Sequence, residues 1–515
     1  MLRVVLQFIL YKRGFMTVYN INLGIGWASS GVEYAQAYRA SIFRELQIPA
    51  KFIFTDMFQV ENIQHYTSNI GFEDNEIIWL YSYFTDVKIA PSTYPKEQLE
   101  KSFSQAITKI EENGTLSRYH FDDNYYANVV LCGSHNQYVQ RVEYVSKGKL
   151  IRKDYYTYTK LFSEYYAPLD NQSRLYQRHF FNEDGSLAYE EICQDKQSIF
   201  RFTDHICFGK EALIAYMLEK LELTSQDMIL LDRATGIGQA VFTHKGRAKL
   251  VVVIHAEHYN VKGTDDYNVL WNNYYEYQFT NAEQVDAFIT STEKQKEVLQ
   301  QQFQNYANQA PAIYAIPVGS LETLRIPKQS RKAYSLMTSS RLASEKHIDW
   351  LVSAVIKAHK TIPELIFDIY GEGGERQKLA NLIEEGGAQS YITLKGHQNL
   401  RDVYQNYELY LTASTSEGFG LTLMEAVGSG LPIIGLDVPY GNQTFVDNGK
   451  NGYLIERQEP DNKQYLVDSY VEKLIDFYHQ DLKQAQQHSY QKAEPFLHGH
   501  LAELWKNFVE DLCHD

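Results

Sequence analysis

The chain has 515 residues, 44% hydrophobic and 22% charged, which is typical of a globular protein of about three domains. Its formal net charge of −15 argues against a nucleic-acid partner, because neutralising phosphates requires a net basic face. The four cysteines lack Cys-x-x-Cys spacing, which argues against a zinc ribbon or a disulfide framework and fits a reducing cytoplasm.

The sequence contains no apolar run of about 18 residues, so it predicts no membrane-spanning helix. Residues 1–15 carry a short apolar stretch without a signal-peptide cleavage site, and we interpret them as an upstream start or a loosely packed extension before Met16. A membrane-surface anchor is the alternative for these residues. We therefore expect a cytoplasmic protein, with peripheral association at the inner face of the membrane left open.

The first 200 residues contain two different patterns. Residues 16–60 run strand, glycine-rich turn, helix and strand, which predicts a β-α-β unit with parallel strands. Residues 61–200 instead hold tyrosine-rich strands with turn signals such as Asp122-Asp123, Ser146–Lys149 and Asn182–Ser186. We interpret this range as an antiparallel meander, inserted into the first domain.

From residue 201 the alternation of apolar strands and helices returns. Residues 201–318 complete a discontinuous N-terminal Rossmann-like domain, and residues 319–490 form a second one. The predicted helix LRDVYQNY belongs to the second domain, and a final helix, 491–515, is expected to return to the first. The predicted fold class is α/β, with two Rossmann-like domains facing across a cleft and an inserted antiparallel sheet. Such sheets bind ligands at the carboxyl ends of their strands.

Two acidic residues separated by seven positions give the strongest chemical signal. Glu417 and Glu425 follow a predicted strand, and the glycines between them allow the backbone to approach a ligand closely. The helix that begins near Leu421 presents free N–H groups, which favour a bound phosphate. An ordinary strand-loop-helix connection with an acidic first turn is the alternative interpretation.

A second motif, Ser340–Lys346, follows the first strand of the same domain. Its cations Arg341 and Lys346 are expected to reach the same sheet edge as Glu417, where they can hold a diphosphate and stabilise charge on a leaving group. A solvated surface loop is the alternative. Together the two motifs favour a donor site for a nucleotide-diphosphate sugar.

The series SRLxxEK, FDIYGEG, LKGHQ, SEGFGLTLMEA and NGYLI resembles glycosyltransferase family 4, a GT-B family, over residues 330–460. With LGIGWASSGVEYAQAYR, the tyrosine-rich insertion and IHAEHY, the chain is similar to the GtfA family. These are catalytic subunits that attach N-acetylglucosamine (GlcNAc) to serine-rich repeat adhesins. The resemblance implies a retaining transfer from UDP-GlcNAc to Ser or Thr hydroxyls, the first step of O-glycosylation. It also implies a GtfB-like partner and the adhesin polypeptide as acceptor.

The resemblance assigns roles to residues that match its motifs. Arg341 and Lys346 would bind the diphosphate, Glu417 the sugar and Glu425 the ribose, and His255, Arg341, Lys346 and Glu417 are the expected catalytic residues. The further donor-binding residues are Gly31, Val32, His397, Gln398, Gly418, Phe419, Gly420 and Leu421. No cofactor or metal is expected, because fixed cations would replace a divalent ion.

Several alternatives remain at this point. The alternative interpretation of His255 is a core histidine at a strand end, and that of HAEH is a metal pair with His258. The turn around Gly24 and Gly26 is alternatively a simple tight connection. A teichoic-acid glucosyltransferase and a non-catalytic GtfB-like subunit are the competing functions. The sequence does not distinguish GlcNAc from glucose as the donor sugar. The insertion is expected to bind the partner or acceptor, or else only to cap the domain.

Overall fold

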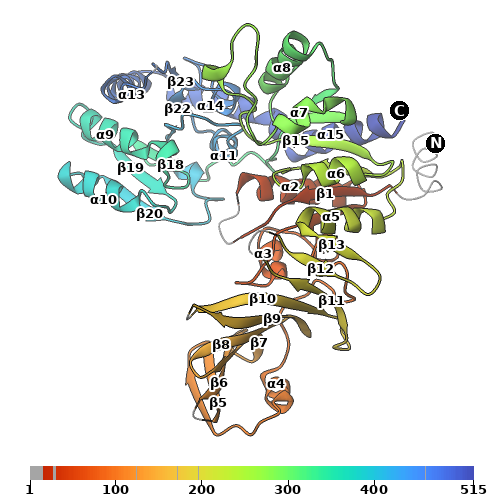
Figure 1. Cartoon of the computed structure of the whole chain (residues 1–515). Coiled ribbons are helices and arrows are strands. Elements are labelled where there is room, and N and C mark those ends of the chain that lie inside the picture. The colour runs from red at the N-terminus through yellow and green to blue at the C-terminus, as the bar shows by residue number, and fades with distance from the viewer. Residues whose placement is uncertain are drawn as a thin grey trace. The chain divides into compact units, whose positions relative to one another are not determined.

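The computed structural model describes residues 16–26, 30–122, 124–170, 172–194, 197–458 and 460–514 (Figure 1). It divides into two compact units. Unit 1 holds the described residues up to Val252 and Thr280–Asp286, and unit 2 holds Val253–Phe279 and the described residues from Ala287 onwards. The predicted extension 1–15 and Asp123 of one predicted turn lie outside the described residues. Within these ranges no helix has the length and apolarity to span a bilayer.

Unit 1 contains a parallel sheet in which the β-α-β unit predicted for residues 16–60 is confirmed. Its strands pair in the order β15-β14-β1-β2-β3, and Val18 lies opposite both Ala50 and Met228. The strands are β1 (Val18–Asn22), β2 (Ala50–Phe54), β3 (Ile77–Trp79), β14 (Met228–Leu231) and β15 (Lys249–Ile254). The helices between them are α2 (Gly31–Glu45), α3 (Ile63–Asn69), α4 (Lys96–Ser102), α5 (Gly209–Lys220) and α6 (Gly238–His244).

A ten-stranded antiparallel sheet forms the rest of unit 1, with its strands hydrogen-bonded in chain order from β4 to β13. They are β4 (Lys109–Asn113), β5 (Leu116–Asp122), β6 (Tyr125–Cys132), β7 (Tyr138–Ser146), β8 (Lys149–Tyr156), β9 (Lys160–Leu169), β10 (Gln172–Phe181), β11 (Leu187–Ile192), β12 (Ile199–Arg201) and β13 (Ile206–Phe208). The sheet therefore runs from 109 to 208, whereas the prediction placed the meander at 61–200. Residues 61–108 hold α3, α4 and β3, and β3 pairs parallel with β2.

Many of the sheet's aromatic side chains are buried against one another. The rings of Tyr155 and Phe162 stack at 4.2 Å between centroids, and those of Phe180 and Tyr189 at 4.4 Å. Aromatic pairs of this kind add stability beyond the area they bury. Much of the tyrosine-rich composition of this range thus serves the core of the sheet.

Unit 2 contains a second parallel sheet, in the order β20-β19-β18-β21-β22-β23. Its strands are β18 (Ser335–Ser339), β19 (Ile366–Tyr370), β20 (Ile392–Gly396), β21 (Leu409–Leu411), β22 (Ile433–Leu436) and β23 (Gly452–Ile455). The helices are α9 (Ile348–Ala358), α10 (Arg376–Glu385), α11 (Leu421–Gly428), α12 (Gly441–Phe445), α13 (Lys463–Tyr478) and α14 (Leu482–Ala493). The prediction of a helix over LRDVYQNY is wrong. This segment forms only a single 3-10 turn, η6 (Tyr404–Asn406), and no α-helix.

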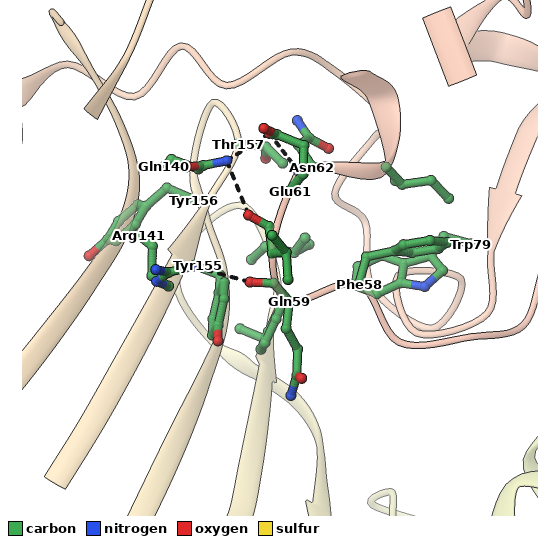
Figure 2. Close-up of a pocket in the computed structure, with 14 residues that line it drawn as sticks. Phe58, Gln59, Glu61, Asn62, Trp79, Gln140, Arg141, Tyr155, Tyr156 and Thr157 are labelled. Atoms are coloured by element: carbon green, nitrogen blue, oxygen red, sulfur yellow. Dashed lines mark hydrogen bonds between the residues drawn. The ribbon is translucent and has the colours of Figure 1, made fainter. Parts of the chain in front are cut away.

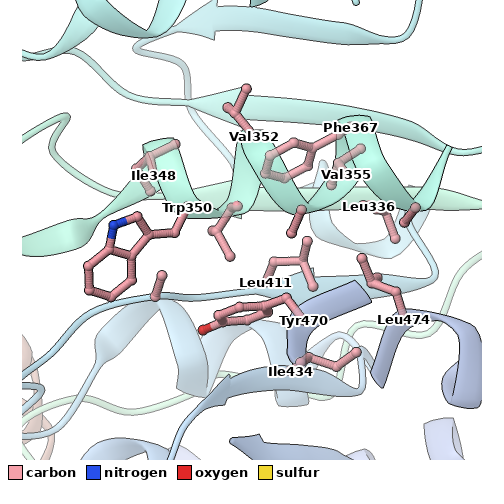
Figure 3. Close-up of a cluster of buried hydrophobic side chains, with 14 of the residues drawn as sticks. Leu336, Ile348, Trp350, Val352, Val355, Phe367, Leu411, Ile434, Tyr470 and Leu474 are labelled. Carbon is pink, nitrogen blue, oxygen red and sulfur yellow. The ribbon is translucent and has the colours of Figure 1, made fainter. Parts of the chain in front are cut away.

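Neighbouring residues of β18 point into two separate cores. Leu336 belongs to the cluster beneath α9 and α13, drawn in Figure 3 with Val355 and Tyr470. Met337 belongs to a second cluster with Leu423 of α11. Because successive side chains of a strand point to opposite faces, each face of the sheet is covered by helices. This burial fixes β18 and β21, and with them the loops that follow.

The remainder of unit 2 comprises β16 (Ala287–Thr290), β17 (Ile313–Ala315), α7 (Glu276–Thr280), α8 (Glu293–Gln302) and α15 (His498–His514). Strands β16 and β17 pair parallel, with Phe288 opposite Ile313. In α15, the ring of Phe508 packs edge-on against Tyr314 of β17, with 4.9 Å between ring centroids. The last helix therefore lies against a strand of the predicted range 201–318.

Candidate functional site

The strand order of the unit 2 sheet reverses between β18 and β21. Chain order proceeds from β18 to β19 and β20 on one side, then continues from β21 on the other. Loops that leave neighbouring strands at such a switch point diverge and form a crevice for ligands. Ser340–Lys346 follows β18, and Thr412–Gly420 follows β21. Both predicted motifs thus occupy the switch point.

Lys346 and Glu417 connect these two loops. The Nζ of Lys346 donates a hydrogen bond of 2.8 Å to Oε2 of Glu417 and one of 3.2 Å to Oγ of Ser414. Both side chains are partly accessible, at 20% and 22% exposure. The structure therefore joins the two predicted residues in one charged site that a ligand can reach.

Glycine contacts hold the Arg341 loop in place. A Cβ on Gly371 would lie 1.9 Å from the carbonyl oxygen of Ser340, and one on Gly373 would lie 2.4 Å from that of Leu342. Only glycine fits there, because both positions also have a positive φ. The Arg341 side chain extends from this fixed loop with 73% exposure, contacting Glu345 at 3.3 Å. It is thus much less enclosed than Lys346.

The helix α11 begins at the end of the second loop. Gly420 caps it with a φ of +86°, and Leu421 is its first residue. Phe419 is buried and packs against Phe445 at 5.2 Å between ring centroids. The buried ring fixes the loop, and the first N–H groups of α11 supply donors suited to an anion.

The segment after β15 contacts the same loop. A Cβ on Gly418 would lie 2.8 Å from the carbonyl oxygen of His255. Oγ of Ser416 donates to Oε2 of Glu257 at 3.3 Å, and burial raises the pKa of Glu257. The backbone N–H of His255 donates to the Tyr275 hydroxyl at 2.9 Å. The His255 backbone therefore lies next to the Glu417 loop, and the role of its side chain stays a prediction.

Glu425 lies on α11 between a hydroxyl and a guanidinium. The Tyr404 hydroxyl donates to its Oε2 at 3.1 Å, and Nη2 of Arg325 is 3.8 Å from its Oε1. Burial raises the pKa of Glu425, while Arg325 and Tyr404 oppose that rise. The Nη1 of Arg325 is buried without a hydrogen-bond partner among the described residues. No sequence motif predicts a role for Arg325, because it lies in a linker 100 positions before Glu425.

His258 is a core residue. It is fully buried, its Nε2 lies 2.7 Å from Oε1 of Gln302, and Nδ1 lies 3.3 Å from the Tyr440 hydroxyl. Burial lowers its pKa to about 4. The imidazole is thus neutral, with Nε2–H donating to Gln302 and Nδ1 accepting from Tyr440. A metal pair of His255 and His258 does not fit this arrangement, because both ring nitrogens of His258 already have partners.

The remaining predicted residues belong to segments other than the loops of Lys346 and Glu417. His397 and Gln398 are exposed in the loop after β20, where Nε2 of Gln398 donates to the Lys395 carbonyl at 3.0 Å. Gly31 and Val32 open α2 in unit 1, and the N–H of Val32 donates to Oγ of the capping residue Ser30 at 3.3 Å. Contact of these four residues with the donor stays a prediction.

A pocket in unit 1 contains none of the predicted site residues. It lies between the loop after β2 and strands β7 to β9, and aromatic rings form part of its wall (Figure 2). Gln140 donates to Oε1 of Glu61 at 2.7 Å, and Arg141 donates to the Gln59 carbonyl at 3.4 Å. These bonds tie the loop to the antiparallel sheet, so the pocket belongs to a structural junction.

Two family models match the antiparallel sheet of unit 1 and the parallel sheet of unit 2. The family "GtfA extended beta-sheet domain" matches residues 109–204, and "Glycosyl transferases group 1" matches residues 322–493. The GtfA subunit of a UDP-N-acetylglucosamine–peptide N-acetylglucosaminyltransferase from Streptococcus parasanguinis is 62% identical over 97% of this chain and 100% of the relative. A poly(ribitol-phosphate) alpha-N-acetylglucosaminyltransferase from Staphylococcus aureus is 25% identical over 86% of this chain and 90% of the relative.

Solved structures agree with this relationship. The pneumococcal O-GlcNAc transferase GtfA, in complex with UDP and GlcNAc, is 52% identical with a TM-score of 0.93, covering 98% of this chain and 100% of that one. A chain of a GtfA/B complex is 54% identical with a TM-score of 0.92, covering 97% and 100%. The predicted fold class, GT-B with an inserted antiparallel sheet, is confirmed. The chain therefore belongs to the family of GtfA subunits of UDP-N-acetylglucosamine–peptide N-acetylglucosaminyltransferases.

Proposed function

We propose that this chain is the catalytic subunit that transfers GlcNAc from UDP-GlcNAc to Ser and Thr hydroxyls of a serine-rich polypeptide. The observation that carries the proposal is the Lys346–Glu417 contact at the switch point, with Glu425 on the helix that follows. The full-length similarity to GtfA subunits supports the same donor and acceptor. A non-catalytic binding subunit has no need of this set of residues.

Each part of the site has a role in donor binding. Lys346, the N-terminus of α11 and the exposed Arg341 hold the diphosphate and stabilise the charge that develops as it leaves. Glu425 accepts hydrogen bonds from the ribose hydroxyls. Glu417 orients Lys346 and contacts the sugar ring, beside the His255 backbone. The protein thus contributes positioning and electrostatic stabilisation.

The transfer proceeds with retention of the anomeric configuration. The bond between the anomeric carbon and the phosphate oxygen breaks, and UDP departs with the bonding electrons. The acceptor hydroxyl forms the new C–O bond on the same face of the sugar, and its proton passes to the departing phosphate oxygen. This scheme uses no covalent enzyme intermediate. Anomeric analysis of the product by NMR tests it: a β-linked product would contradict retention.

The reaction proceeds without a divalent metal, since Lys346, Arg341 and the α11 N–H groups supply the positive charge that neutralises the diphosphate. We expect transfer to persist in excess EDTA. The control is the same reaction with added Mg²⁺ or Mn²⁺. A loss of activity in EDTA that either ion restores would contradict this part of the proposal.

A GtfB-like subunit is the partner, and the ten-stranded sheet is its docking region. The similar GtfA/B complex supports such a partner. Within the sheet, Tyr176 and Leu187 are exposed at 45% and 50% although most of its aromatic rings are buried. Replacing both by Asp should abolish co-purification with the partner and leave UDP-GlcNAc hydrolysis intact. If the complex still forms, the partner surface lies elsewhere.

One experiment tests the function directly. The chain and its partner are incubated with a serine-rich peptide and either UDP-GlcNAc or UDP-glucose, and the products are analysed by mass spectrometry. We expect a mass increase of one N-acetylhexosamine per modified serine with UDP-GlcNAc. A ribitol-phosphate polymer serves as the competing acceptor. Modification of the polymer but not of the peptide would favour the teichoic-acid alternative, which the 25% identity to such an enzyme makes the weaker candidate.

A further inference from the structure

A long connection joins β15 and α7 (Figure 1). It carries several exposed apolar side chains. We call residues 260–274 the 260–274 loop. The exposed fractions are 87% for Tyr267, 61% for Tyr274, 59% for Val261 and 49% for Leu270. Single exposed apolar residues are ordinary, but four within 15 positions of one loop indicate a binding surface.

The loop has a hydrogen-bonded stem. The backbone N–H of Asn260 donates to the Leu270 carbonyl at 2.8 Å, and that of Asn272 donates to the His258 carbonyl at 2.9 Å. Trp271 lies in the stem between Leu270 and Asn272, and its ring packs against Phe279 with 4.6 Å between ring centroids. The base of the loop is therefore anchored in the core of unit 2.

The tip has a fixed backbone as well. Oδ1 of Asp265 accepts hydrogen bonds of 2.8 Å from the N–H groups of both Tyr267 and Asn268. The Tyr306 hydroxyl donates to the Asp265 carbonyl at 2.7 Å. Tyr267 is thus presented on an ordered turn, which lowers the entropy cost of binding through its ring.

The stem is continuous in the chain with a segment that contacts the donor loop. In that preceding segment, the His255 carbonyl lies close to Gly418, and Glu257 accepts a hydrogen bond from Ser416. Tyr440 links the two segments. Its hydroxyl lies beside His258, and its backbone N–H donates to the Glu417 carbonyl at 2.8 Å. A ligand held by the loop would therefore be held on the element that also supports the Glu417 loop.

We propose that the 260–274 loop binds the acceptor polypeptide and guides it to the donor sugar. This inference rests on the proposed function, because it names the surface that receives the substrate of that reaction. Tyrosine rings pack against the backbone and small side chains of an extended peptide, and their hydroxyls can bond to its amides. The loop carries Asp265, Asp266 and Lys262, so it offers no basic surface for a phosphate polymer.

The test compares the double variant Tyr267→Ala/Tyr274→Ala with Ile326→Ala. Ile326 is the control, since it is an exposed apolar side chain, at 68%, outside both the 260–274 loop and the ten-stranded sheet. Three quantities are measured for the complete complex: the KM for a serine-rich peptide, the rate of UDP-GlcNAc hydrolysis without acceptor, and co-elution with the partner. We expect a roughly tenfold rise in the peptide KM of the double variant only, with hydrolysis and co-elution unchanged.

The other outcomes overturn the inference in distinguishable ways. An unchanged peptide KM shows that the loop does not hold the acceptor. Loss of co-elution shows that the loop binds the partner subunit instead, and an equal fall in hydrolysis shows that it supports only the donor site. If the native complex itself transfers nothing to the peptide, the proposed function fails rather than the role of the loop.

Discussion

Lys346 and Glu417 form a hydrogen-bonded ion pair of 2.8 Å although they are 71 positions apart in the chain. The pair exists because β18 and β21 are neighbours in the sheet and their loops diverge from adjacent strand ends. In a complex with the donor, the diphosphate would compete with Glu417 for the lysine. The contact therefore keeps Lys346 oriented before the donor binds.

Replacing Lys346 by Ala should lower turnover by about a hundredfold or more, because its charge is aimed at the leaving group. Arg341→Ala should have the smaller effect of the two, since Arg341 is 73% exposed and solvent weakens its interactions. Steady-state kinetics with UDP-GlcNAc measure both. Lys378→Ala removes an exposed lysine of α10 and is the control. Near-normal turnover of Lys346→Ala would refute the assignment.

The two carboxylates should have separable effects. Glu425→Gln should mainly weaken UDP binding, because it removes an acceptor for the ribose hydroxyls. Glu417→Gln should mainly lower turnover with UDP still bound, because its partner is Lys346 at 2.8 Å. Titration calorimetry with UDP, beside turnover measurements, tests the pair of variants. Equal losses of UDP affinity in both would count against separate roles.

The sequence predicted those parts of the site that lie within continuous motifs. Lys346 and Glu417 each lie in a loop that follows an apolar strand, and the alternation of strands and helices places such loops at one sheet edge. Arg325 could not be predicted, because its pairing with Glu425 depends on the path of a linker 100 positions away. Strand β3 was missed for a related reason: three residues are too few to show a pattern.

Burial was the least predictable property. In the tyrosine-rich range, Tyr155, Phe162 and Phe180 are buried in stacks, whereas Tyr176 and Phe208 are exposed. Alternation along a strand shows which residues share a face, but it does not show whether another element covers that face. His258 illustrates the same limit, since the sequence alone does not reveal its bonds to Gln302 and Tyr440.

Gly441 provides a steric test of the donor loop. A Cβ at this position would lie 2.1 Å from the Phe419 carbonyl oxygen. The backbone N–H of Gly441 donates to the Glu417 carbonyl at 2.8 Å. Gly441→Ala should therefore displace the Glu417 loop and lower kcat/KM at least tenfold, at a cost of about 1–3 kcal/mol in stability. Gly374→Ala is the matched control, since no atom lies within 4 Å of its added Cβ. Similar kinetics of both variants would show that the loop tolerates the shift.

Arg325 should set the pH range in which Glu425 can bind the ribose. Burial raises the pKa of this carboxyl, and the guanidinium at 3.8 Å opposes the rise, together with Tyr404. Arg325→Gln removes the cation, so the pKa should rise further and the carboxyl should become protonated as the pH falls. A protonated carboxyl is the poorer acceptor for ribose hydroxyls. The variant should therefore lose UDP affinity more steeply than the native chain as the pH is lowered.

Calorimetric titration with UDP at a series of falling pH values measures the effect as the ratio of the variant Kd to the native Kd. The phosphate groups of UDP titrate equally in both experiments, so they cancel from the ratio. We expect the ratio to grow as the pH falls for Arg325→Gln and to stay constant for Arg325→Lys, which keeps the charge. Arg401→Gln, at an exposed pair with Glu322, controls for the loss of a surface arginine. A ratio that is raised but independent of pH would mean that Arg325 contacts the nucleotide itself rather than acting through Glu425.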